Sequence, residues 1–178
     1  MSSYKISWIN NIYWRSIDIF IRFLFVFFIY FNYIIESKIK ENDDQYIIRE
    51  INFLNKSTNV KKTINQIHYV KWPDHGVPET KDGKVFEAFH EIIKKVNEFR
   101  NNKPIIIHCS AGVGRTGTFI SMYYLEKEII SQKNEQIIKF NIFNLVRKIK
   151  EMRLNMVQTV DQYKFIYEYV KYLLSKYI

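Results

Sequence analysis

The only cysteine of the chain, Cys109, lies in the stretch PIIIHCSAGVGRTGTFI, between an apolar run and a loop with two glycines. Gly112 and Gly114 free the backbone to curl, and such a curl turns successive amide N–H groups inward. Together with the positive end of a following helix, these amides form a cradle for a tetrahedral oxyanion such as phosphate. The same field favours thiolate over thiol at Cys109, and the thiolate is the reactive form. The amides expected to line the cradle are those of Ser110, Ala111, Gly112, Val113, Gly114 and Arg115.

Three side chains beside the cysteine fit the same chemistry. The planar guanidinium of Arg115 can bind two phosphate oxygens at once, which a lysine cannot do. The hydroxyl of Thr116 is placed to donate a hydrogen bond to the sulfur and so make it a better leaving group, and His108 is expected to hold the loop through its ring nitrogens. The alternative for each feature is ordinary: lone cysteines are often inert core residues, and glycine pairs often only mark turns.

The pattern H-C-x-x-G-x-x-R after an apolar strand resembles the signature loop of the protein tyrosine phosphatases, which reads HCSAGVGRTG here. Two further segments resemble the same family in the family's order. WPDHGVP, from Trp72 to Pro78, is similar to the mobile loop that carries the general acid, and VQTVDQY, from Val157 to Tyr163, is similar to the glutamine loop. Asp74 precedes Cys109 by 35 residues and Gln158 follows it by 49.

The resemblance implies a role for each matching residue. Asp74 takes the place of the general acid, which helps to expel a tyrosine phenolate of pKa about 10. Gln158 takes the place of the residue that orients the hydrolytic water, while Trp72 and Gln162 support the two loops. The family hydrolyses phosphotyrosine in proteins, as part of signal transduction, through a cysteinyl-phosphate intermediate and without a metal or cofactor. Alone, Asp74 would be interpreted as a turn former and Gln158 as a solvent-facing helix start.

The sequence also departs from the family. Its larger tyrosine-specific domains carry an upstream Lys-Asn-Arg-Tyr segment, whose tyrosine stacks on the substrate ring, and no such run occurs here. We therefore expect a shortened or N-terminally incomplete domain. Three alternatives stay open: a catalytically weak or inactive phosphotyrosine-binding module, a phosphatase that also accepts phosphoserine, phosphothreonine or phosphoinositide, and a gene product that does not fold alone.

The elements that must position these residues follow from the hydrophobic pattern. Asn32–Glu36, Gln45–Phe53 and Lys62–Lys71 are rich in Ile, Tyr and Phe, and predict a β-meander. Lys84–Arg100 has the 3.6-residue period of a helix with one buried face. Pro104–Ile107 is a continuous apolar run, which predicts a strand buried on both faces.

Three more helices are predicted, over Thr116–Ile130, Asn141–Arg153 and Thr159–Lys176. The last of them is expected to pack through one face, which comprises Val160, Tyr163, Tyr167, Val170 and Leu174. The predicted fold is α/β and like that of the tyrosine phosphatases, with a mixed, twisted sheet flanked by helices on both faces. The phosphate loop is then expected at the carboxyl end of a central strand.

Composition narrows the class of protein. The chain has 178 residues, 47% hydrophobic and 25% charged, which suits one globular domain. One cysteine excludes an internal disulfide, no metal-ligand spacing occurs, and a cytoplasmic protein is expected. The net charge of +9 favours anionic partners, but the basic residues lack the aromatic interleaving of a nucleic-acid binder, so no nucleic acid is expected. We interpret the following basic residues as parts of solvated helix faces: Lys139, Arg147, Lys148, Lys150 and Arg153.

The first residues of the chain have three possible interpretations. Ile19–Ile35 is apolar except for Arg22 and Asn32, and at seventeen residues it falls just short of the ~20 that span a bilayer. It is a membrane-associated helix, a buried element of the fold, or part of a mistranslated or truncated start. The expected domain organisation is a divergent hydrophobic segment over residues 1–29, with membrane association through residues 19–35 as one possibility, and a phosphatase-like catalytic domain over residues 30–178.

Overall fold

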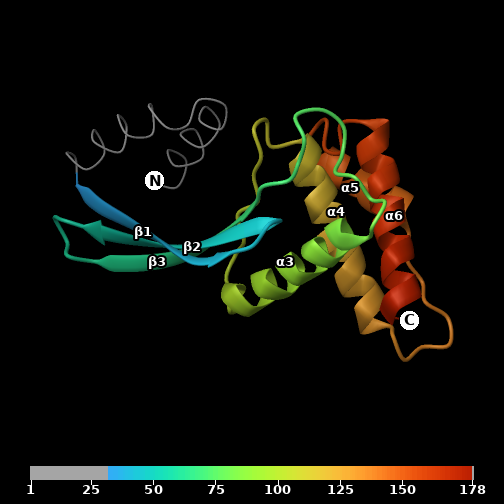
Figure 1. Cartoon of the computed structure of the whole chain (residues 1–178), viewed down its shortest axis with the longest axis horizontal. Coiled ribbons are helices and arrows are strands. Elements are labelled where there is room, and N and C mark those ends of the chain that lie inside the picture. Colours follow the sequence, from blue (N-terminus) through green and yellow to red (C-terminus); the bar gives the residue numbers. More distant parts are fainter. Residues whose placement is uncertain (1–31, 178) are drawn as a thin grey trace. The chain divides into compact units, whose positions relative to one another are not determined.

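The computed structural model describes residues 32–177. Contacts divide these residues into two compact units, one made of 32–72 with 95–101 and the other of 73–94 with 102–177. Figure 1 shows the strands, which belong to the first unit, and the helices, most of which belong to the second. The segment predicted over residues 1–29 lies outside the described residues, and so does most of the apolar run over residues 19–35.

The first unit contains a three-stranded antiparallel sheet in the order β1-β2-β3 (Figure 1). The strands are β1 (Tyr33–Asn42), β2 (Tyr46–Asn55) and β3 (Lys61–Tyr69), and the predicted β-meander is confirmed. β1 continues six residues beyond its predicted end, and a register shift between Ile39 and Glu41 interrupts its pairing with β2. A polar continuation such as Ser37 to Asn42 gives no strand signal of its own, because its backbone is extended by pairing with β2.

Four helices are formed by the described residues: α3 (Lys84–Arg100), α4 (Gly114–Ser131), α5 (Ile142–Met152) and α6 (Val160–Tyr177). Each lies within two residues of its predicted bounds. Local signals explain this agreement. Asn141, for example, caps α5, and its side-chain oxygen accepts the N–H of Asn144 at 2.8 Å.

The core of the second unit lies where α4 packs against α5 and α6 and where aromatic rings from α3 meet α6. The rings of Phe86 and Phe89 lie 5.2 and 5.9 Å from that of Phe165. The predicted packing face of α6 is wrong in part, since Val160 and Tyr167 are 68% and 47% exposed. The buried residues of this helix are Gln162, Phe165, Ile166, Tyr169, Val170 and Leu173. Both faces carry apolar residues and share Val170, so periodicity alone does not choose between them.

The segment Pro104–Ile107, predicted as a buried strand, has no regular secondary structure, and Ile106 is 84% exposed. A parallel strand exists only when neighbouring strands hydrogen-bond to it, and no strand among residues 32–177 pairs with this one. Consequently the described sheet is antiparallel and not mixed. The loop that carries Cys109 therefore follows a segment without regular secondary structure, instead of the carboxyl end of a central strand.

A buried polar cluster joins three helices of the second unit. The hydroxyl of Tyr169 on α6 donates to Glu126 on α4, and His90 Nδ1 on α3 lies 2.9 Å from Glu126 Oε1. The ring of His90 lies 4.5 Å from that of Tyr177. Burial raises the pKa of Glu126 to about 7, and burial also lowers the pKa of His90. The two groups therefore form a neutral hydrogen-bonded pair more readily than an ion pair.

Replacing Glu126 by glutamine is expected to make stability less dependent on pH. Because the folded-state pKa of Glu126 lies above its unfolded value, this residue's contribution to stability is full below about pH 4.5 and is lost as the pH rises through about 7. Glutamine keeps both hydrogen bonds and removes the ionisation. In urea unfolding, the free energy of unfolding of Glu126→Gln relative to that of wild type should therefore increase by about 2 kcal/mol as the pH rises from 5 to 8.

His90 has the opposite effect on stability. Because its folded-state pKa is lowered, stability falls as the pH drops below the unfolded-state pKa of histidine, near 6.5. This second effect is common to wild type and to Glu126→Gln, and so it largely cancels in the comparison. Glu128→Gln, an exposed change on the same helix, is the control. If the stabilities of Glu126→Gln and wild type changed with pH in parallel, the raised pKa of Glu126 in the folded protein would be contradicted.

Candidate active site

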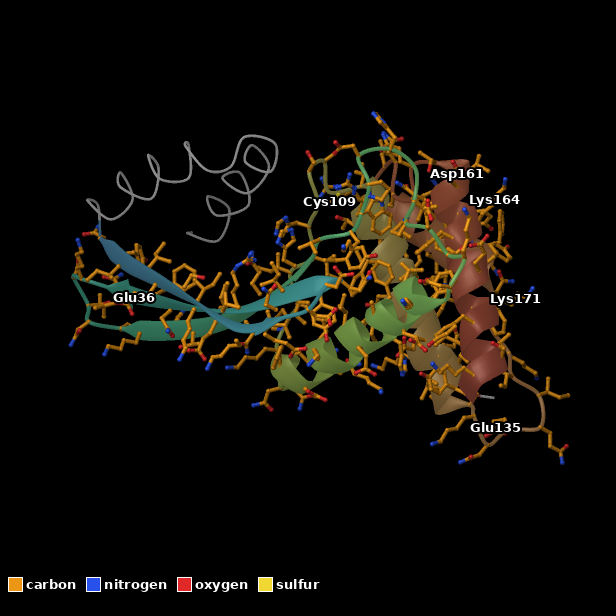
Figure 2. All side chains as sticks on the ribbon, in the orientation of Figure 1. Glu36, Cys109, Glu135, Asp161, Lys164 and Lys171 are labelled. Atoms are coloured by element: carbon orange, nitrogen blue, oxygen red, sulfur yellow. The ribbon has the colours of Figure 1, made fainter. Side chains whose placement is uncertain are left out.

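Cys109 lies in the loop that leads into α4, as Figure 2 shows. Its Sγ atom accepts two hydrogen bonds, one from the N–H of Gly112 at 3.2 Å and one from the hydroxyl of Thr116 at 3.1 Å. Gly112 has a φ of +70°, a conformation in which glycine is favoured, and this lets its N–H turn back toward the sulfur. The loop thus takes the curled form that the sequence predicts.

The surroundings of Cys109 favour the thiolate. Burial alone would raise the pKa of the thiol, but hydrogen bonds from the Thr116 hydroxyl and from the backbone N–H groups of Thr116, Gly112 and Val113 outweigh it and lower the pKa. Each of these donors stabilises negative charge on sulfur more than a neutral thiol. The side chain is half-buried, while Ser110 and Ala111 beside it are exposed, so a ligand can reach the loop.

Arg115, in the first turn of α4, connects the phosphate loop to the segment that carries Asp74. Its Nη2 atom donates to the carbonyl oxygen of Pro73 at 2.9 Å. A guanidinium has five N–H donors in a planar fork, so one bond to Pro73 is compatible with binding an oxyanion. Asp74 itself is exposed. Trp72, the first residue of this segment, is half-buried and stacks edge-on against Tyr69, with ring centroids 6.4 Å apart.

Gln162 organises the segment that carries Gln158. The Thr159 hydroxyl oxygen accepts the N–H of Gln162 at 3.2 Å, and Gln162 Oε1 accepts the N–H groups of Gln158 at 2.8 Å and Thr159 at 3.3 Å. This reciprocal pair is a capping box for α6. Both glutamine side chains also lie close to the phosphate loop at Gly114. A Cβ atom on Gly114 would lie 2.8 Å from Gln162 Nε2 and 3.4 Å from Gln158 Oε1.

The residue before Gln158 is held in a strained conformation. Val157 has a φ of +56°, which a β-branched residue rarely adopts. Its N–H donates to the carbonyl of Val113 at 3.2 Å, and its carbonyl accepts from Lys150 Nζ at 3.0 Å. On α4, Gly117 has no room for a side chain, since a Cβ there would lie 2.5 Å from the Val157 nitrogen. These contacts fix Gln158 beside the phosphate loop.

The structure adds contacts to two basic residues and leaves one prediction open. Lys150 and Arg153 are exposed, as expected of solvated helix faces, and each also donates a hydrogen bond: Lys150 Nζ to the carbonyl of Val157 at 3.0 Å, and Arg153 Nη2 to the carbonyl of Ala111 at 3.2 Å. Their position at the end of α5, a few residues before VQTVDQY, is the signal that could have found these contacts. His108 is exposed, and its expected role in holding the loop stays a prediction.

Two kinds of feature are absent from the described residues. Within residues 32–177, no group of three or more His, Cys, Asp or Glu side chains is arranged to hold a metal ion. None of the helices in the same range combines the length and the apolar composition needed to cross a membrane.

Comparison with known proteins decides the family. The family model described as "Protein-tyrosine phosphatase" matches residues 22–172. The chain belongs to the protein-tyrosine phosphatase family. Among curated phosphatases, it is 37% identical over 131 residues to human tyrosine-protein phosphatase non-receptor type 20 and 34% identical over 137 residues to human receptor-type tyrosine-protein phosphatase alpha. These alignments cover 74% and 77% of this chain, and 29% and 16% of the two relatives.

Solved phosphatase structures agree with this placement. The catalytic domain of human protein tyrosine phosphatase non-receptor type 18 superposes with a TM-score of 0.68 at 26% identity, over 80% of this chain and 49% of that domain. A complex of PTPN18 with HER2 phosphopeptides gives a TM-score of 0.67 at 25% identity. The predicted α/β phosphatase fold is confirmed. The chain spans about half of the solved domain and less than a third of the curated relatives' length.

Proposed function

We propose that the protein hydrolyses phosphotyrosine in proteins through a cysteinyl-phosphate intermediate. The observation that carries the proposal is the Cys109 sulfur, which accepts hydrogen bonds from Gly112 and Thr116 at the start of a helix and has a lowered pKa. A thiolate beside the amides of a helix start is both a nucleophile and part of an oxyanion site. Family membership supports the reaction class.

In the first step, the Cys109 thiolate attacks phosphorus and the bond from phosphorus to the tyrosine oxygen breaks. The loop amides and the Arg115 guanidinium bind the non-bridging oxygens, where charge is held during transfer. Asp74 donates its proton to the departing phenolate oxygen, so that a neutral tyrosine leaves. The bond from Arg115 to Pro73 supports this role, because it ties the residue next to Asp74 to the loop that binds phosphate.

In the second step, water attacks the phosphorus of the cysteinyl phosphate and the bond from phosphorus to sulfur breaks. Gln158 orients the water and the Asp74 carboxylate takes its proton, so inorganic phosphate is released and Asp74 regains its acid form. The Gly112 N–H and the Thr116 hydroxyl stabilise the departing thiolate. The contacts of Gln158 and Gln162 with Gly114 support this placement. No step requires a metal or cofactor.

The proposal also includes the domain limits, the partners and the location of the protein. We assign the catalytic domain to residues 30–178, with residues 1–29 as a separate hydrophobic segment. The family match over residues 22–172 covers most of the assigned domain but begins within the hydrophobic segment. The partners are phosphotyrosine-containing proteins, for which a relative's complex with HER2 phosphopeptides is the supporting precedent. The reaction requires the Cys109 thiol to stay reduced, and this supports a cytoplasmic location.

The direct test is hydrolysis of a phosphotyrosine peptide by the full chain in the presence of EDTA. We expect turnover that EDTA leaves unchanged and that vanadate inhibits, since vanadate imitates the transferring phosphoryl group. A matched phosphothreonine peptide, whose alkoxide is a poorer leaving group, should react far more slowly. Peptide binding without release of phosphate would instead identify a non-catalytic binding module, and equal rates on the two peptides would identify a phosphatase of broader specificity.

A further inference from the structure

The peptide unit between Ala111 and Gly112 is hydrogen-bonded at both ends. Its carbonyl oxygen accepts from Arg153 Nη2 at 3.2 Å. Its N–H, which belongs to Gly112, donates to Cys109 Sγ at 3.2 Å. One rigid group therefore lies between an arginine at the end of α5 and the sulfur of the proposed nucleophile.

The two hydrogen bonds depend on each other. Residues 32–177 contain no cis peptide bond, and in a planar trans peptide the C=O and N–H point in opposite directions. If this peptide turned over, the carbonyl oxygen of Ala111 would face the sulfur and repel the thiolate. Gly112, at a φ of +70°, belongs to the residue type that tolerates either orientation, so the loop sequence alone does not fix it.

Arg153 is well placed to hold the peptide. Its guanidinium also covers the face of Gly112, since a Cβ atom there would lie 3.2 Å from Arg153 Nη2 and 3.5 Å from its Cζ. The backbone N–H of Arg153 donates to the carbonyl of Ile149 at 3.1 Å, which anchors the residue to the last turn of α5. A cation on a peptide oxygen also polarises the N–H at the other end, and this strengthens the bond to sulfur.

We infer that Arg153 is a positioning residue of this site: it orients the peptide between Ala111 and Gly112 so that the Gly112 N–H stabilises the Cys109 thiolate. The inference rests on the proposed function for its catalytic meaning. Arg153 acts from the side of the loop opposite to the sulfur and touches neither the thiolate nor, in the proposed reaction, the phosphoryl group. It differs in this respect from Arg115, which is proposed to bind the phosphate itself.

The test is the pH profile of Cys109 alkylation by iodoacetamide, in the full chain and at a temperature where melting curves show each variant folded. Because the chain has one cysteine, the mass of the adduct reports this site alone. In Arg153→Met, Cys109 should be alkylated about fivefold more slowly at pH 6, the factor that corresponds to the free energy of one hydrogen bond. At high pH, where the thiol is fully ionised, the variant should reach the wild-type rate. Arg153→Lys, which keeps a cation of different shape, should show a smaller shift in the same direction.

Arg147→Met is the matched control, since Arg147 is an exposed arginine on the same helix that pairs with Glu151 at 3.1 Å. It should reproduce the wild-type profile. A wild-type profile in either Arg153 variant would overturn the inference, so Arg153→Lys decides alone if Arg153→Met does not fold. Alkylation of Cys109 does not require the protein to hydrolyse a substrate. If the wild type did not hydrolyse phosphotyrosine, the proposed function would be refuted, while the alkylation profiles would still test the role of Arg153.

Discussion

Cys109→Ser is expected to lower phosphotyrosine hydrolysis by a factor of about 10⁴ or more, the scale on which removal of a covalent nucleophile acts. Serine retains the shape of the side chain, but its hydroxyl is not ionised near neutral pH by the donors that lower the pKa of the thiol. The same variant should still bind phosphotyrosine peptide, because the loop amides and Arg115 are unchanged. Steady-state hydrolysis and calorimetric titration of the peptide measure the two effects separately.

Two further points strengthen the comparison between wild type and Cys109→Ser. No other thiol is present, so residual hydrolysis by Cys109→Ser cannot come from a second cysteine. In wild type, the alkylation rate at Cys109 should rise with pH around a midpoint below the ~8.5 of a free cysteine, and vanadate should slow the reaction. Hydrolysis that survives in Cys109→Ser, or a wild-type midpoint equal to that of free cysteine, would remove the nucleophile from the mechanism.

Asp74→Asn is expected to lower turnover by a factor of about 10² to 10⁴ when the leaving group is tyrosine. An amide cannot donate the proton that a phenolate requires as it departs. With p-nitrophenyl phosphate, whose leaving group is a weaker base, the loss should be much smaller. The ratio of the two rates therefore distinguishes loss of a proton donor from general damage to the site, and parallel measurements on both substrates provide it.

Glu79→Gln is the control for this change. Glu79 is exposed, lies in the same loop region and loses the same charge on substitution, but it is not at the position of the acid. It should leave both substrates within about twofold of wild type, as is usual for exposed positions away from such features. If Asp74→Asn lowered the rate equally on both substrates, Asp74 would not be the acid.

The fold was predicted well where each segment carries its own signal. The bounds of α3 over Lys84–Arg100 agree with prediction to the residue, because a helix of this length displays its apolar period and its end in the sequence. Pro104–Ile107 failed because a buried strand and an exposed apolar segment look the same until the neighbouring strands are known. For α6, two apolar faces compete, and only the packing of α3 and α4 selects the one with Phe165 and Tyr169.

The sequence motifs identified some of the candidate site residues, and the structure revealed a further one. The motifs pointed to Cys109, Asp74, Arg115 and Gln158, since their chemistry is visible in residue type and spacing. The hydrogen bond of Arg153 was missed because an exposed basic residue at a helix end has the same appearance in the sequence whether or not it also binds a carbonyl. Its contact with Ala111 spans 42 residues of sequence, and such a pairing becomes visible only after the chain has folded.

The two glycines of α4 near the phosphate loop face different neighbours, and this constrains how the protein can evolve. Gly114 meets the ends of the Gln162 and Gln158 side chains, so a larger residue there would require both side chains to move. Gly117 meets the backbone of Met156 and Val157. No exchange of side chains can make room at that point, so descendants of this gene should keep Gly117 even after the rest of the helix has diverged.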